Sequence, residues 1–98
     1  MNASITQALR DYIFERDSYT CVVCTGAASD IHHVVARSLG GRNHPHNLVA
    51  VCRPHHCQLH GERIRGSVYT TFEVRQAVHE YLQDLYAEDI EAGVWAGG

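Results

Sequence analysis

The chain contains no lysine, and it has only two prolines, one methionine and one tryptophan among its 98 residues. Its basic residues are therefore all arginine, and the planar guanidinium group suits bidentate contact with phosphate. An arginine bias in the encoding genome would explain the same composition equally well. No apolar run approaches the roughly 20 residues that a membrane-spanning helix requires, so the sequence predicts no membrane partner.

The first residues also lack the basic region followed by an apolar stretch that is typical of a signal peptide. We therefore expect a cytoplasmic protein. In that compartment disulfides are rare, so the four cysteines are expected to be metal ligands. Buried thiols or disulfide bonds are the alternative interpretation of the same residues.

The length of 98 residues predicts a single domain that spans residues 1–98. A chain this short buries only about 60–65% of the surface that its unfolded form exposes. Its core is therefore thin, and a bound metal would add stability that the core does not supply. The hydrophobic content of 45% excludes a largely disordered chain.

The net charge of −3 hides an uneven distribution of charge. Residues 1–66 carry seven arginines against five acidic residues, whereas residues 67–98 carry one arginine, Arg75, against six acidic residues. The first two thirds of the chain are net positive before any bound metal is counted. A polyanionic partner would be attracted to this part and repelled by the acidic remainder.

The middle of the chain has the pattern of two short strands followed by a helix. Residues 31–35 and 48–51 are rich in β-branched residues, which predicts strands. The segment between them, residues 37–46, is dense in glycine, proline and asparagine and predicts a loop. Pro54 suits the first turn of a helix that we expect over about residues 53–62.

Helices are expected at both ends of the chain. Within residues 5–16, aliphatic side chains recur every four positions, as Ile5, Leu9 and Ile13. A longer helix is expected over about 72–92, where Thr70 and Glu73 match a capping box. Its expected buried stripe comprises Val74, Val78, Tyr81, Leu82 and Leu85.

Beyond this helix, residues 93–98 are expected to be frayed and dispensable. Two aromatic residues near the C-terminus, Tyr86 and Trp95, are candidates for contact with a partner protein.

Two pairs of ligating residues have the spacing of a zinc site, Cys21-x2-Cys24 and Cys52-x2-His55. Two intervening residues let one turn of chain wrap a tetrahedral ion. Four protein ligands would close the coordination shell, so this site would be structural and would contribute on the order of 10 kcal/mol to folding. Cys57 is an alternative to His55 as the fourth ligand, but the spacing favours His55.

The remaining histidines predict a second metal site. On the expected helix, His56 and His60 share a face and can chelate one ion, whereas His55 points about 100° away, toward the zinc site. His32 and His33 precede them, and one imidazole would be left over as a base. Neighbouring residues of a regular strand point to opposite faces, so the two cannot both point inward.

Four other polar residues in the chain are considered as candidates for a functional site. Asn47 is either a turn residue or an amide that ties the glycine-rich loop to the strand and holds a histidine in place. His44, His46 and His79 have no partner at a ligand spacing and are expected at the surface.

Taken in order, these residues resemble the HNH endonuclease family and its ββα-metal (His-Me finger) fold. The resemblance lies in Asp30-Ile-His-His-Val-Val-Ala-Arg-Ser-Leu-Gly-Gly and in Asn47-Leu-Val-Ala-Val-Cys-Arg-Pro-His-His. Upstream, Arg16-Asp-x-Tyr-x-Cys-x2-Cys24 is similar to the zinc-bearing members, and the paired histidine with His-x3-His resembles colicin-type nucleases. The resemblance to the family covers about residues 15–62.

The resemblance implies a small α+β domain in which a ββα-metal motif carries a structural zinc knuckle between an N-terminal helix and a long C-terminal helix. It implies that His33 is the general base and that Asn47 orients it through the loop. His32, His56 and His60 would bind the catalytic metal. Many family members have Asp at the position of His32, and three imidazoles favour binding of Zn²⁺, Ni²⁺, Co²⁺ or Mn²⁺ over Mg²⁺.

The expected function is therefore metal-dependent hydrolysis of DNA phosphodiester bonds with low sequence specificity. Arg37, Arg42 and Arg53 are the first candidates for phosphate contacts, ahead of Arg63 and Arg65. The candidate assemblies are a homodimer and a larger nuclease complex, and the expected location is the cytoplasm of a bacterial or phage-infected cell. The alternatives are a non-catalytic zinc-containing DNA-binding module or an accessory subunit of a phage packaging or restriction complex.

Overall fold

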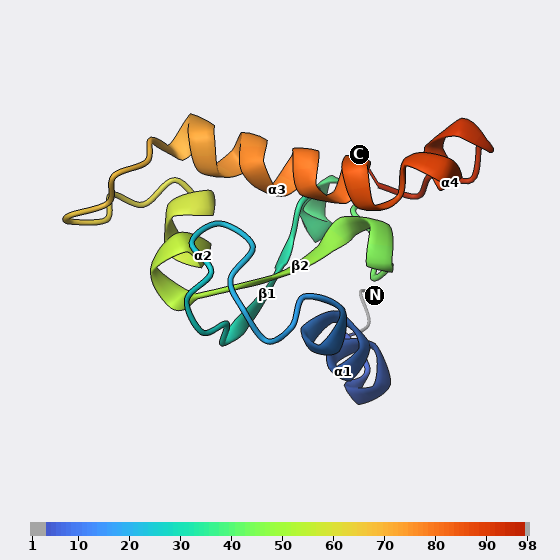
Figure 1. The fold of residues 1–98 in the computed structure, drawn as a ribbon, viewed down its shortest axis with the longest axis horizontal. Helices are drawn as coiled ribbons and strands as arrows, with labels where there is room; N and C mark the ends of the chain where they lie inside the picture. The colour runs from blue at the N-terminus through green and yellow to red at the C-terminus, as the bar shows by residue number, and fades with distance from the viewer. Residues whose placement is uncertain (1–3, 98) are drawn as a thin grey trace.

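The computed structural model describes residues 4–97 and places a two-stranded antiparallel sheet between two helices (Figure 1). Strands β1 (Asp30–His33) and β2 (Leu48–Val51) form the sheet. Helix α1 (Gln7–Arg16) lies on one side of the strands and α3 (Thr71–Leu85) on the other. The small α+β class predicted from the sequence is confirmed.

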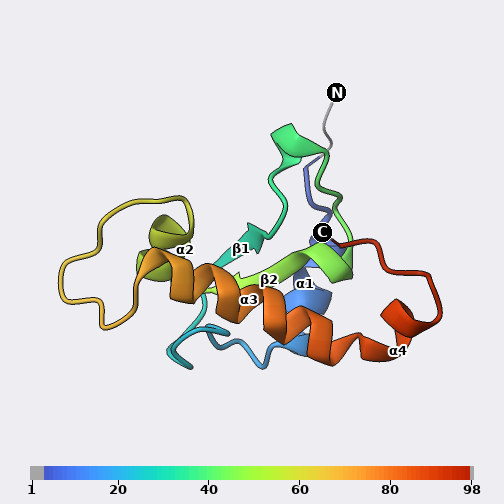
Figure 2. The same ribbon diagram turned by 90° about the horizontal axis from the view of Figure 1, so that it is seen from above.

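Helix α2 (Arg53–Leu59) follows β2 directly and packs beside the first turns of α3 (Figure 2). A loop over residues 60–70 joins α2 to α3 and extends past the sheet. A short helix α4 (Ala87–Glu91) ends the helical part, and two 3-10 turns, η1 (Arg37–Leu39) and η2 (Pro45–Asn47), lie between the strands.

The core has two halves because successive residues of β2 point to opposite faces of the sheet. Val49 and Val51 pack with apolar side chains of α2 and α3. Leu48 and Ala50 pack with Ile13 of α1 and with β1. All four residues of β2 are buried, which explains why this strand is apolar throughout instead of alternating.

Local signals place the helix boundaries. Thr70 Oγ1 accepts a hydrogen bond from the Glu73 amide at 3.1 Å and Glu73 Oε1 accepts one from the Thr70 amide at 2.8 Å, so the predicted capping box is confirmed. Helix α1 begins at Gln7 because the Thr6 side chain caps it. Helix α2 ends at Leu59, before residue 62, because the chain turns at Gly61, which has a φ of +93°.

The prediction of one helix over 72–92 was wrong. Helix α3 ends at Leu85 and α4 starts after Tyr86, whose φ of −112° and ψ of 30° interrupt the helical conformation. The predicted buried stripe is correct for Val74, Val78 and Leu82, but Leu85 lies past the core and is 46% exposed.

The expectation of a frayed C-terminal segment was wrong for residues 93–97, and so was the surface position expected for His46; residue 98 lies outside the described residues. His46 is buried, and the Trp95 ring stacks on it with a centroid distance of 4.8 Å. Its Nε2 donates to Asp89 Oδ2 at 2.8 Å, and its Nδ1 accepts from the Ala96 amide at 3.0 Å. Tyr86 packs on the same ring. Tyr86 and Trp95 thus both pack on His46 within the chain, and their contact with a partner protein stays a prediction.

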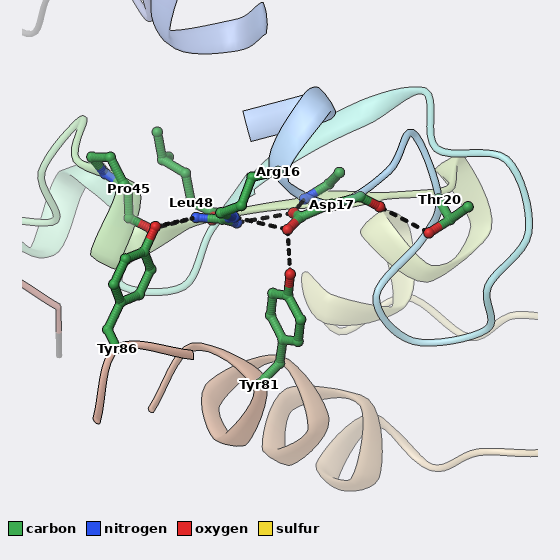
Figure 3. A network of polar contacts seen from close by, with 8 residues as sticks. Arg16, Asp17, Thr20, Pro45, Leu48, Tyr81 and Tyr86 are labelled. Atoms are coloured by element: carbon green, nitrogen blue, oxygen red, sulfur yellow. Dashed lines mark hydrogen bonds and ion pairs between the residues drawn. The ribbon is translucent and has the colours of Figure 1, made fainter. Parts of the chain in front are cut away.

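A buried arginine joins the end of α1 to β2 and to the C-terminal part of the chain (Figure 3). Arg16 forms a two-pronged ion pair with Asp17, at 2.8 and 2.9 Å, in which the two side chains are 8% and 0% exposed. It also donates to the carbonyl oxygens of Pro45 and Leu48 and to the Tyr86 hydroxyl. Burial alone would lower the pKa of Arg16, but the bonds to Asp17 and Tyr86 outweigh it and raise that pKa.

Asp17 extends the same network to α3 (Figure 3). Its Oδ2 accepts a hydrogen bond from the Ala50 amide of β2 at 2.9 Å, and its Oδ1 accepts one from the Tyr81 hydroxyl. Burial and the negative charge of Asp17 raise the pKa of Tyr81 to about 12. One carboxylate therefore connects α1, the sheet and α3.

Within residues 4–97, no helix has both the length and the apolar character needed to cross a bilayer.

We predict that Tyr81→Phe lowers the free energy of unfolding by about 1.5–3 kcal/mol at pH 7, because a hydrogen bond to a buried carboxylate is lost. A raised folded-state pKa means that this contribution is complete below the ordinary tyrosine value of 10 and is lost as the pH rises to about 12. Urea unfolding at several pH values measures both effects. Tyr19→Phe, at a 62% exposed position, is the matched control. Equal stability of Tyr81→Phe and wild type would show that the bond contributes nothing.

Candidate metal centres

The four residues predicted to form a zinc site lie together. Cys21 and Cys24 belong to the turn after α1, Cys52 is the N-cap of α2, and His55 lies in the first turn of α2. Their ligand atoms all lie within 4.8 Å of one another. The group is a Cys3His cluster that could hold a metal ion such as zinc.

The distances within this cluster fit tetrahedral coordination. Ordinary zinc bond lengths place two sulfur ligands about 3.8 Å apart and a sulfur and a nitrogen ligand about 3.6 Å apart. The Sγ atoms of Cys24 and Cys52 are 3.9 Å apart. His55 Nδ1 lies 3.8 Å from Cys21 Sγ and 3.3 Å from Cys52 Sγ. Four protein ligands leave no position for a substrate, so the cluster suits a structural ion.

The structure also separates the two candidates for the fourth ligand. His55 lies in the cluster and Cys57 lies outside it, as the spacing favoured. All four cysteines are free thiols, which removes the disulfide interpretation. Burial and the neighbouring Cys21 raise the pKa of the Cys52 thiol to about 11, so binding of a cation at neutral pH must displace its proton.

A second cluster consists of the imidazoles of His32, His56 and His60, whose ligand nitrogens also lie within 4.8 Å of one another. The Nε2 atoms of His56 and His60 are 3.2 Å apart, close to the roughly 3.3 Å expected between two nitrogen ligands of one tetrahedral ion. Three ligands leave at least one coordination position open. This cluster therefore suits an ion that also meets a substrate or water.

Asp30 orients one of these ligands, and the sequence reasoning missed it as a site residue. Its Oδ2 lies 2.8 Å from His56 Nδ1. A carboxylate can only accept, so Nδ1 carries the proton and Nε2 keeps its lone pair for a metal. Burial raises the pKa of Asp30, but the hydrogen bonds from His56 and Ser29 and the charge of Arg53 lower it overall. The sequence did contain a signal for Asp30. Side chains alternate along a strand, so Asp30 and His32 are expected on the same face of β1.

The side chain of His32 extends from β1 toward α2 and is held in the neutral form that binds metals. It is 6% exposed. Burial, followed by the nearby His56 and His60, lowers its pKa to about 3. Within the part of the chain that the structure describes, its Nδ1 has no hydrogen-bond partner. A buried nitrogen without a partner is unfavourable, and a bound cation in this cluster would relieve that cost.

The pairing of β1 with β2 determines the surroundings of His32 and His33. His32 pairs with Val49 and shares its face, toward α2 and α3, whereas His33 pairs with Leu48 at the end of β1. His33 Nε2 lies 2.8 Å from Asn43 Oδ1. An amide oxygen can only accept, so Nε2 carries the proton and Nδ1 is the nitrogen that can accept one. Asn43 is a second residue that sequence reasoning missed.

Asn47 ties the loop after β1 to the start of β2, as one part of its second interpretation stated, and its effect on a histidine stays a prediction. It is 1% exposed. Its Oδ1 accepts from the Val35 amide at 2.8 Å, and its Nδ2 donates to the carbonyl oxygens of Val35 and Arg42. These bonds end β1 at His33, two residues earlier than predicted. Gly41 is required here, because a Cβ would lie 1.7 Å from Val35 O.

Both His32 and His33 line a cavity of about 650 Å³ that also includes His60. The cavity lies between the loop after β1 and helix α3, and Arg75 of α3 contributes to its wall. The Nε of Arg75 donates to Leu59 O at 3.0 Å. Arg75 was not among the arginines predicted to contact phosphate, so its position beside the histidines was unexpected.

The predicted phosphate-binding arginines have different surroundings. Arg53 is 74% exposed and its Nε lies 2.9 Å from Asp30 Oδ2. Arg42 is exposed and Arg37 is half-buried. Arg63 and Arg65 are exposed on the loop between α2 and α3.

No protein-family model matches the chain, and no curated protein matches its sequence. The two clusters and the cavity are therefore the basis for a functional proposal.

We predict that the purified protein carries about one tightly bound zinc per chain and that Cys24→Ser unfolds it or makes it insoluble, because one ligand of a closed shell is lost. Cys57→Ser, outside the cluster, is the matched control and should keep both the zinc and the thermal stability. Elemental analysis and thermal denaturation measure the two quantities. A folded, zinc-free Cys24→Ser protein of unchanged thermal stability would contradict the prediction.

Proposed function

We propose that β1, β2 and α2 form a ββα-metal motif and that the protein is a metal-dependent endonuclease of the HNH type. The observation that carries this proposal is the shared cavity, because two imidazoles of the three-histidine cluster, His32 and His60, line the same space as a further histidine, His33. The substrate would be DNA, cut with low sequence specificity. The proposal includes the structural role of zinc at the Cys3His cluster.

His33 would act as the general base. The proton on Nε2 is held by Asn43, so Nδ1 would accept a proton from the attacking water. Base catalysis of this kind contributes about 10²–10⁴-fold to a rate. Asn47 would hold the loop that carries Asn43 and so keep the base in place. By resemblance to the family, the leaving group is the 3′ oxygen and the product carries a 5′-phosphate.

His32, His56 and His60 would hold the catalytic ion, and Asp30 would orient His56. A divalent cation there supplies charge that offsets the phosphate and stabilises the leaving oxygen. Three imidazoles favour Zn²⁺, Ni²⁺, Co²⁺ or Mn²⁺ over Mg²⁺ in binding. Arg37, Arg42 and Arg53 would contact phosphates on either side of the scissile bond.

A non-catalytic zinc-containing DNA-binding module would need the Cys3His cluster and the arginines only. It gives no role to a second, three-ligand cluster or to an imidazole oriented by an amide beside it. An accessory subunit of a larger complex could carry the same nuclease site and act only with its partners. Activity of the isolated chain separates these possibilities.

We predict that the wild-type protein nicks or linearises plasmid DNA when a series of divalent metals is tested. His33→Ala should keep the fold and the zinc while the rate falls by about 10²–10⁴-fold. His60→Ala should instead raise the metal concentration needed for half-maximal rate. Circular dichroism and zinc analysis of both variants are the controls. Full activity of His33→Ala at saturating metal would refute the assignment of the base.

We further predict that Asn43→Ala lowers kcat by roughly tenfold or more, because the imidazole loses the bond that selects its tautomer and orientation. KM and the metal concentration for half-maximal rate should stay near the wild-type values, since Asn43 touches neither the phosphate nor the ion in this mechanism. Steady-state kinetics on a labelled oligonucleotide measures these values. An effect on the metal requirement alone would assign Asn43 to the metal site instead.

A further inference from the structure

The cavity beside the three-histidine cluster is larger and more apolar than phosphodiester hydrolysis requires. Its volume of about 650 Å³ lies within the usual range for binding sites of small organic molecules. Besides the histidines, its walls include aliphatic side chains such as Val34, Leu59 and Val78. A metal site that contacted only a phosphate and water would not need such walls.

Two large apolar side chains that line this cavity are exposed to solvent. Phe72, in the first turn of α3, is 73% exposed, and Leu39, at the end of η1, is 79% exposed. They approach the cavity from two segments that lie more than thirty residues apart in the sequence. Exposed apolar groups gathered around a concave site are typical of a ligand surface. An aromatic ring there offers a face on which a planar base can stack.

Polar groups of α3 line the same cavity. Arg75 is held at the wall by its bond to Leu59 O. Gln76 Nε2 donates to Glu80 Oε1 at 2.9 Å, which leaves the amide oxygen of Gln76 to accept from a ligand. His79 adds an imidazole. A cation, hydrogen-bonding groups and an aromatic face are together the features that bind a single nucleotide.

The position of the cavity limits which nucleotide can occupy it. His32, His33 and His60 belong both to the proposed catalytic site and to the cavity wall. A base that binds in the cavity would therefore belong to a nucleotide next to the phosphate that lies at the ion. In a duplex the faces of each base are covered by its stacked neighbours, whereas an unpaired base exposes both faces and its hydrogen-bonding edge.

We propose that this cavity binds the unpaired base of the nucleotide next to the scissile phosphate, with Phe72 as its stacking surface. The preferred substrate is then DNA that is single-stranded or locally unpaired. This inference rests on the proposed function for the role of the neighbouring site, but binding of the base itself can be measured without cleavage.

The test compares binding of a fluorescein-labelled oligonucleotide, single-stranded or annealed to its complement, by fluorescence anisotropy without added divalent metal. The wild-type protein should bind the single strand more tightly than the duplex. Phe72→Ala should weaken single-strand binding by about tenfold, the usual cost of one lost base stack, with a smaller effect on the duplex. Val68→Ala is the matched control, because Val68 is 84% exposed on the loop before α3 and does not line the cavity.

A cleavage assay with metal added separates this inference from the proposed function. Supporting results are faster wild-type cleavage of the single strand than of the duplex and a loss of that preference in Phe72→Ala. If Phe72→Ala binds the single strand as wild type does while wild type cuts plasmid DNA, the base site is refuted and the nuclease remains. If wild type cuts no DNA but its single-strand binding depends on Phe72, the nuclease is refuted and the base site stands. A change from dimer to monomer in Phe72→Ala, without a change in DNA binding, would mark a protein interface and refute the base site.

Discussion

The buried ion pair between Arg16 and Asp17 is the interaction on which the arrangement of the protein depends. Asp17 accepts from the Ala50 amide, and Ala50 O in turn accepts from the Val22 amide at 3.1 Å. The turn that carries Cys21 is therefore attached to the strand that leads to Cys52. Breaking a buried pair by removing one partner typically costs about 3–5 kcal/mol. In a core this thin, that loss would weaken the attachment of α1 to β2, the strand that leads to Cys52.

The alternation of side chains along β1 gives His32 and His33 different surroundings. Asp30 and His32 point toward α2, where His56 and His60 complete the three-imidazole cluster. His33, the last residue of β1, is oriented by the loop residue Asn43 and lines the same cavity as His32 and His60. Rotation around α2 does the same for adjacent histidines, since His55 joins the cysteines and His56 the imidazoles. The first cluster offers four ligands, which would close a tetrahedral shell, and the second offers three, which would leave a position open.

Much of the site could be predicted from the sequence because ligand spacing is a local property. A Cys-x2-Cys turn and a pair of imidazoles four residues apart on a helix bring their atoms together whatever the rest of the fold does. Strand β2 and the capping box formed by Thr70 and Glu73 could also be predicted, because each depends on residues only a few positions apart. The residues that support the ligands were missed. Asn43 lies ten residues from His33, and Asp30 lies 26 residues from His56.

The sequence by itself thus determined which residues could bind metal, the two strands and the start of the long helix, since each depends on neighbours along the chain. The tertiary structure alone decided the strand register, and with it which of His32 and His33 faces the cluster. It also decided that His46 is buried beneath Trp95 and that α3 brings Arg75 and Phe72 to the histidine site. These contacts join segments far apart in the chain, and no local pattern of residues encodes the distance between them.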